Sequence, residues 1–172
     1  MTETRDVATT LQVQFGFTDQ ANDPALVRHS PLSRGYIGVS QQDSGGAVVS
    51  ARHEIFWLVM DLPELLSGLS AFLRNRRTKH YSFTSSDMTC LLQFDRRKRA
   101  MLCLQINETA MLRPEAAILT AFQQGVTRFY EGEYATVDLN YVVAGDRIET
   151  ERALDQEFRR CCEEFLTIPN TR

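Results

Sequence analysis

The sequence lacks the local motifs that identify several large classes of enzyme. It contains no G-x-S-x-G elbow, no Walker loop and no dinucleotide-binding fingerprint. Its three histidines, His29, His53 and His80, lie in separate segments, and Trp57 stands where a zincin motif beginning at His53-Glu54 would need a second histidine. These absences predict a non-enzymatic protein with no catalytic residues, no metal site and no cofactor. An enzyme with scattered catalytic residues ranks last among the hypotheses.

Cysteine and long apolar runs are scarce as well. Four cysteines in 172 residues do not make a disulfide scaffold, so we expect reduced thiols. No apolar run approaches the roughly 20 residues that span a bilayer. The richest run, residues 55–60, predicts a buried strand. Because the N-terminus is polar and has no apolar signal segment, the default expectation is a cytoplasmic location.

The composition is typical of one water-soluble globular domain. Hydrophobic residues make up 43% of the chain and charged residues 24%. We expect a single domain over 1–172, with frayed ends at 1–9 and 167–172 and a long loop at 18–34. The predicted fold class is α+β, with a mainly antiparallel sheet of six to eight strands and three helices packed largely on one face.

Hydrophobic periodicity places these elements along the chain. Apolar residues that alternate with polar ones predict strands, and apolar residues at three- and four-residue spacing predict helices. Asp61, followed by Pro63 and Glu64, has the spacing of a capping box at the start of the first helix. The predicted strands are 11–17, 36–40, 47–51, 53–60, 80–84, 88–94, 100–106 and 137–143, and the predicted helices lie near 62–76, 113–131 and 147–166.

Basic residues concentrate in two short clusters, which form the candidate binding surface. With Asp95 the clusters carry a charge of +7, whereas the remaining 11 basic and 21 acidic residues carry −10, giving the formal net charge of −3. A mildly acidic protein with one concentrated positive surface is a candidate for binding anions or an acidic partner. The clusters consist of Arg74, Arg76, Arg77 and Lys79, and of Arg96, Arg97, Lys98 and Arg99.

Strand pairing predicts that the two clusters lie together. If strands 80–84 and 88–94 are antiparallel, the end of the second returns to the start of the first, where the predicted helix ends. A register with Phe94 opposite Ala100 is favoured for the next hairpin, because it gives one entirely apolar face. That face holds Met88, Cys90, Leu92, Phe94, Leu102, Leu104 and Ile106. We therefore expect all eight cations at one sheet edge, called the cationic edge below.

Two interpretations of the cationic edge stay open. Arginine side chains match the geometry of phosphate and carboxylate groups, so the edge is suited to nucleic acid, a phosphate ligand or an acidic protein. Alternatively, the first cluster merely stabilises the negative end of a helix dipole, and the second is a solvated, charged hairpin tip. Single-stranded nucleic acid would also require exposed aromatic platforms, whereas Tyr81 and Phe83 are expected in the core.

The last predicted helix has an acidic outer face, which is a second candidate surface. Such a face attracts basic protein targets, although solubility alone also accounts for it. Its members are Glu149, Glu151, Asp155, Glu157, Glu163 and Glu164.

The order of elements in residues 53–106 resembles that of small bacterial immunity proteins of polymorphic-toxin systems. In both, an apolar strand leads through a Leu- and Phe-rich helix, here 62–73, into a strand pair with a charged turn, here 95–99. The basic turn and the elements after Tyr134 depart from that pattern. The resemblance implies a non-enzymatic inhibitor that binds and occludes one partner protein, and it carries over no functional residues. A protein partner is therefore the leading hypothesis, with nucleic acid or a phosphate ligand as the alternative.

Overall fold

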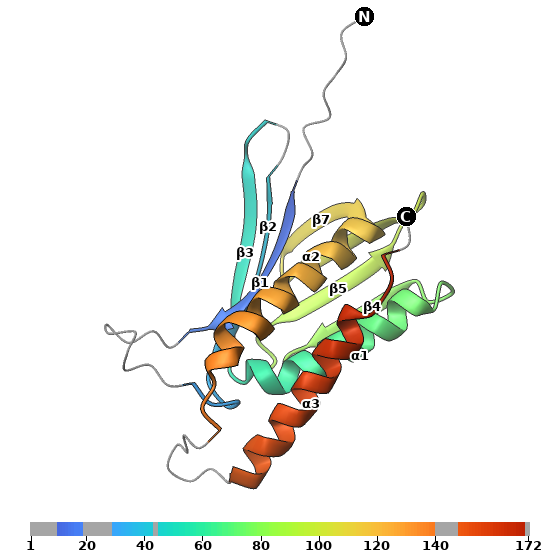
Figure 1. The fold of residues 1–172 in the computed structure, drawn as a ribbon. Coiled ribbons are helices and arrows are strands. Elements are labelled where there is room, and N and C mark those ends of the chain that lie inside the picture. Colours follow the sequence, from blue (N-terminus) through green and yellow to red (C-terminus); the bar gives the residue numbers. More distant parts are fainter. Residues whose placement is uncertain (1–9, 19–28, 43–44, 140–147, 171–172) are drawn as a thin grey trace, which may run out of the picture.

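The structure is a computed structural model that describes residues 10–18, 29–42, 45–139 and 148–170. Within these residues the strands form two antiparallel sheets, ordered β1-β2-β3 and β4-β5-β6-β7, which confirms the predicted α+β class (Figure 1). Helix α1 lies in the chain between the last strand of the first sheet, β3, and the first strand of the second, β4. The elements are β1 (Leu11–Phe17), β2 (Gly35–Gln42), β3 (Val48–Ile55), α1 (Leu58–Arg74), β4 (His80–Thr84), β5 (Leu91–Arg96), β6 (Met101–Ile106), β7 (Thr109–Pro114), α2 (Glu115–Arg128) and α3 (Ile148–Leu166). A π-helical turn (Phe129–Glu133) and a 3₁₀ turn (Tyr134–Thr136) follow α2.

The hydrophobic core lies between the inner faces of the sheets and the helices. In β1 the side chains of Val13 and Phe15 are buried and that of Gln14 is exposed, as the alternating sequence predicts. Helix α2 contacts strands of both sheets and packs most closely on β1. Gly125 makes this approach possible, because a Cβ atom at that position would lie 2.6 Å from the carbonyl oxygen of Val13.

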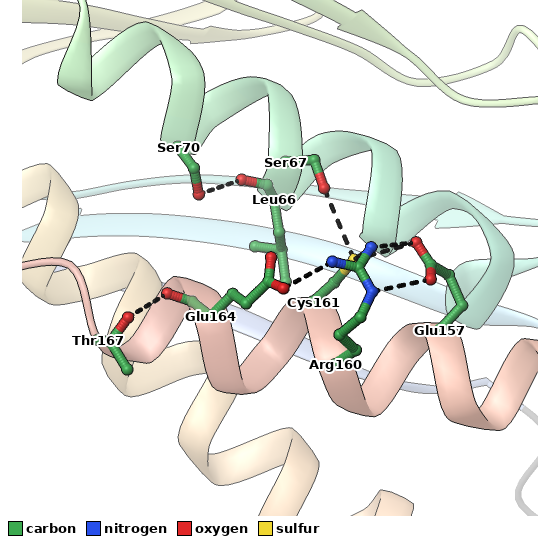
Figure 2. A network of polar contacts seen from close by, with 8 residues as sticks. All are labelled: Leu66, Ser67, Ser70, Glu157, Arg160, Cys161, Glu164 and Thr167. Carbon is green, nitrogen blue, oxygen red and sulfur yellow. Dashed lines mark hydrogen bonds and ion pairs between the residues drawn. The ribbon is translucent and has the colours of Figure 1, made fainter.

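Helices α1 and α3 pack side by side, as Figure 1 shows. Their contact is apolar, with Leu66 of α1 and Phe165 of α3 both buried. At its margin the hydroxyl of Ser67 lies 3.6 Å from the sulfur of Cys161 (Figure 2). In the described part of the chain no helix is long and apolar enough to cross a membrane.

The predicted strand 53–60 is wrong in its second half. β3 ends at Ile55, and α1 already begins at Leu58. The apolar run is too short to distinguish the two periods, and Leu58 and Leu62 are buried on the helical spacing that continues through α1. Asp61 is therefore not the N-cap. The cap position is Trp57, whose side chain makes no capping hydrogen bond.

The predicted hairpin has the correct faces but a shifted register. Phe94 pairs with Leu104 rather than with Ala100. Because the shift is an even number of residues, the inward-facing side chains of β5 and β6 stay inward. Met88 is the exception. It lies before β5 in a turn with φ of 58° and is 82% exposed.

Three further expectations differ from the structure or lie outside it. β7 was not predicted, and it delays the start of the expected 113–131 helix to Glu115. Residues 137–139 form no strand, and the rest of the predicted strand, like 1–9, 19–28 and 171–172, lies outside the described residues. The C-terminal segment packs at Ile168, which is buried and accepts a hydrogen bond from Gln123 at 2.9 Å.

Candidate interaction surfaces

The structure brings the two basic clusters to one edge of the second sheet. The backbone N–H of Arg96 donates to the carbonyl of Lys79 at 2.9 Å, so the end of β5 lies beside the segment that joins α1 to β4. The backbones of both cluster-bearing turns are fixed. Asn75 accepts from the N–H of Arg77 at 3.1 Å, and the N–H of Arg97 donates to Met101 at 2.8 Å.

Arg96 is the one member of the cationic edge that lies inside the fold. Its side chain is 8% exposed, and its guanidinium donates to the carbonyls of Phe72, Leu73, Asn75 and Thr78 at the end of α1. The guanidinium also lies 4.1 Å from the centroid of the Phe72 ring. This side chain satisfies carbonyls that the last turn of a helix leaves unpaired. Arg96 is therefore part of the scaffold, and it is not available to a ligand.

One further cation of the edge is paired within the protein. Arg76 lies 3.4 Å from the carboxylate of Glu115, which also accepts from Arg96 at 2.9 Å. Within the described residues, none of the other six cations forms an ion pair, and all six are exposed. They are Arg74, Arg77, Lys79, Arg97, Lys98 and Arg99.

The acidic face predicted on the last helix is smaller than expected. Glu151 and Asp155 are buried, and Asp155 accepts a hydrogen bond from the hydroxyl of Tyr134 at 2.8 Å. Figure 2 shows Arg160 between two exposed carboxylates, those of Glu157 and Glu164. Its hydrogen bonds lower the pKa of Glu157. The side chain of residue 149 lies outside the described set, so α3 retains few uncompensated acidic groups.

A surface that the sequence did not reveal is the outer edge of β3. In an antiparallel pair, alternate residues bond to the neighbouring strand and the residues between them face away. The hydrogen bond from Gln42 to Thr10 shows that the even-numbered residues of β2 face β1, so its odd-numbered residues face β3. The backbone groups of Val48, Ser50 and Arg52 therefore point away from the sheet. Among the described residues, these groups have no hydrogen-bond partner.

The corresponding edge of β1 is covered. Arg128 of α2 donates to the carbonyl of Val13 at 3.0 Å, and Glu133 accepts the N–H of Phe17 at 2.8 Å. Side chains from α2 and the turn after it thus occupy the positions that another strand would need.

The second sheet presents less favourable edges than β3. In β7 the outward-facing Pro114 has no N–H, and Arg113 donates to the carbonyl of Leu112 at 3.0 Å. β4 spans five residues, and its outward-facing Ser82 is flanked by polar His80 and Thr84. β3 spans eight residues, and among the described strands it is the long one with an open edge.

An exposed apolar cluster, called the apolar anchor here, lies at the end of β3. Phe56 and Trp57 are 44% and 38% exposed, with ring centroids 5.5 Å apart in an edge-to-face arrangement. The guanidinium of Arg34 lies 4.2 Å from the Phe56 ring centroid. Asp87 accepts the N–H of Phe56 at 2.9 Å, which brings the turn that carries exposed Met88 to this end of the strand. The apolar anchor therefore consists of Phe56, Trp57 and Met88.

Two carboxylates fix the turn that carries Met88. Burial raises the pKa of Asp61, whose oxygens accept the N–H and hydroxyl of Ser86. Burial also opposes ionisation of Asp87. Its hydrogen bonds from Ser85, Thr89 and Phe56 outweigh this effect and lower its pKa to about 2. The turn is thus held rigidly against the end of β3.

An open hollow of about 490 Å³ runs beside the edge of β3. Residues 50–53 form one side of the hollow and residues 106–109, at the β6–β7 turn, form the other. Nδ2 of Asn107 lies 2.8 Å from Nδ1 of His53, which joins the two sides at this point. The open edge is therefore the wall of a groove.

Comparison with protein-family models, curated proteins and solved structures finds no match. Among the residues that the structure describes, no group of three or more His, Cys, Asp or Glu side chains could hold a metal ion. The arguments for function therefore rest on this chain's own surfaces.

Proposed function

We propose that this protein is a binding module that takes up an extended segment of a partner protein at the open edge of β3. The observation that carries this proposal is the run of unpaired backbone groups at Val48, Ser50 and Arg52. A partner strand that pairs there would satisfy these N–H and carbonyl groups and extend the first sheet to four strands. Backbone hydrogen bonds would supply affinity without requiring one particular partner sequence.

The groove beside β3 favours a single extended segment over a second folded sheet. Its two sides are β3 and the β6–β7 turn, and Asn107 holds the turn in place through His53. At the far end the edge is closed, because Thr89 donates to the carbonyl of Glu54 at 3.4 Å and Asp87 accepts the N–H of Phe56. The pairing site is thus limited to residues 48–52 of β3, where Val48 is 63% exposed.

The apolar anchor supplies the side-chain contact that strand pairing lacks. Tryptophan, phenylalanine, methionine and arginine are enriched at the energetic centres of protein interfaces. Here Phe56, Trp57 and Met88 meet Arg34 where the edge of β3 ends. A partner segment on β3 would run toward this cluster and bury an apolar side chain against it.

We further propose that the module acts by occlusion, as an inhibitor or immunity protein. An extended segment held in the groove is unavailable to any other protein. Binding alone is therefore enough to block the interactions that the partner protein makes through this segment. The resemblance of residues 53–106 to toxin immunity proteins supports this mode of action, and no catalytic step is required.

Proline substitution at the edge tests the proposal. Ser50→Pro removes an outward N–H and leaves the hydrogen bonds between β3 and β2 in place. Ser82→Pro makes the same change on the outward side of β4 and is the matched control. After circular dichroism has shown that both variants fold, Ser50→Pro should lose the protein that co-purifies with the unmodified chain, and Ser82→Pro should retain it. Retention by Ser50→Pro would contradict strand addition at β3.

A further inference from the structure

The cationic edge has a different position and chemistry from the β3 groove. Its six exposed cations without an ion pair in the described part of the chain lie at the C-terminal end of α1 and the β5–β6 turn, whereas the apolar anchor lies at the N-terminus of α1. Helix α1 has 17 residues and is about 25 Å long, so the two surfaces lie at opposite ends of it. Figure 1 shows β3 and the β5–β6 turn on opposite sides of the molecule.

The backbone beneath these cations is pre-organised. Arg96 ties the end of α1 to β5 through four carbonyl groups, and the carbonyl of Ala100 accepts the N–H of Glu115 at 3.0 Å. Arg99 and Ala100 both have positive φ values, 59° and 56°, which gives the tip a defined tight turn. The cations are therefore carried on a fixed frame, and ligand binding would not have to order the backbone.

We infer that the cationic edge binds an acidic segment of a protein, one rich in aspartate or glutamate. Four of these six unpaired cations are arginines, whose planar guanidinium groups bind carboxylates in two-pronged pairs. A short acidic segment fits within a surface that carries six cations without an ion pair among the described residues, beside the pairs Arg76–Glu115 and His80–Asp95.

Charge distribution disfavours nucleic acid at the same surface. The 13 basic residues outside this group of six stand against 22 acidic ones, so a long polyanion that extends past the edge meets a repulsive surface. Single strands also need exposed aromatic platforms. Tyr81 is half-buried between Phe72 and Phe94, and it donates to the carbonyl of Leu65 at 3.2 Å.

Fluorescence anisotropy with a labelled oligoglutamate peptide and a labelled short DNA duplex tests this inference. The full chain should bind the peptide more tightly than the duplex, with an affinity that falls as salt rises. The double variant Arg97→Glu with Arg99→Glu should weaken peptide binding by about tenfold or more. Arg152→Glu, an exposed position on α3, is the control and should leave peptide binding unchanged.

Three results would overturn the inference. These are tighter binding of the duplex than of the peptide, no peptide binding at low salt, and equal loss in the edge variant and the Arg152→Glu control. The lysine double variant, Arg97→Lys with Arg99→Lys, keeps the charge and should bind the peptide less tightly than the unmodified chain, because lysine cannot make two-pronged pairs. None of these substitutions touches β3, so failure here leaves the strand-addition proposal standing.

Discussion

The carboxylate of Glu115 accepts a hydrogen bond from Nε of Arg96 at 2.9 Å, and this ion pair joins β5 to the first turn of α2. The two side chains are only 12% and 8% exposed. The same guanidinium holds the last carbonyls of α1, so one side chain connects three elements. Its neighbours Arg97 and Lys98, at the start of the β5–β6 turn, are exposed.

Arg96→Ala should lower the free energy of unfolding by about 3 kcal/mol or more, because it leaves Glu115 buried without its main partner and helix carbonyls unbonded. Arg97→Ala removes an exposed cation from the next position and should change stability by no more than about 0.5 kcal/mol. Urea unfolding followed by circular dichroism measures both. Equal effects of the two substitutions would show that Arg96 is not a structural residue.

Gly125→Ala should destabilise the protein although alanine is the better helix former by about 1 kcal/mol. The added Cβ atom would lie 2.6 Å from the carbonyl oxygen of Val13 and push α2 away from β1. Gly132→Ala is the control, since a Cβ atom there meets nothing within 4 Å. Thermal unfolding should show a lower midpoint for the first variant only. A higher midpoint for Gly125→Ala would mean that α2 does not approach β1 so closely.

The lowered pKa of Asp87 predicts that the folded protein loses stability in acid. Its pKa is lowered from 3.8 to about 2 in the folded protein, so its contribution is fully present above 3.8 and disappears as the pH falls through 2. Asp87→Asn should therefore show a shallower decline of stability between these pH values. Urea unfolding at a series of pH values compares the two proteins. An identical decline in both would assign the acid sensitivity to other carboxylates.

Removal of the apolar anchor should weaken partner binding without unfolding the protein. Trp57→Ser places a favourable capping residue at the start of α1, and Met88→Asn suits the positive φ at that position. Calorimetric titration with the co-purified partner should show a loss of about tenfold or more in affinity for each variant. Leu112→Ser removes a comparably exposed leucine from the second sheet and should have no effect. A loss in that control as large as in the anchor variants would contradict the assignment.

Local periodicity predicted the half-buried strands well and failed where several contacts compete. In β1 the alternation of Val13, Gln14 and Phe15 indicates a strand, because one face is buried and the other exposed. Residues 55–60 are apolar throughout, so the boundary between β3 and α1 depends on packing that no short window contains.

Some features of the candidate surfaces could be predicted from the sequence, and others could not. The meeting of the two basic clusters followed from strand direction alone. The burial of Arg96 had a signal in the sequence, since it lies two residues after Phe94 and so shares the inward face of β5. The open edge of β3 had none, because the order of strands in a sheet is set by long-range contacts. Trp57 was assigned to a buried strand because the apolar run 55–60 does not distinguish a strand from a helix.

Hydrogen exchange at individual β3 amides tests the central claim, uptake of a partner strand, most directly. In the free protein the amides of Val48, Ser50 and Arg52 should exchange fast, and those of Val49 and Ala51, which bond to β2, should exchange slowly. In the complex with the co-purified partner, the outward amides of Ser50 and Arg52 should become protected while the amide of Ser82 on β4 stays fast. Fast exchange at Ser50 and Arg52 in a saturated complex would contradict strand addition at β3.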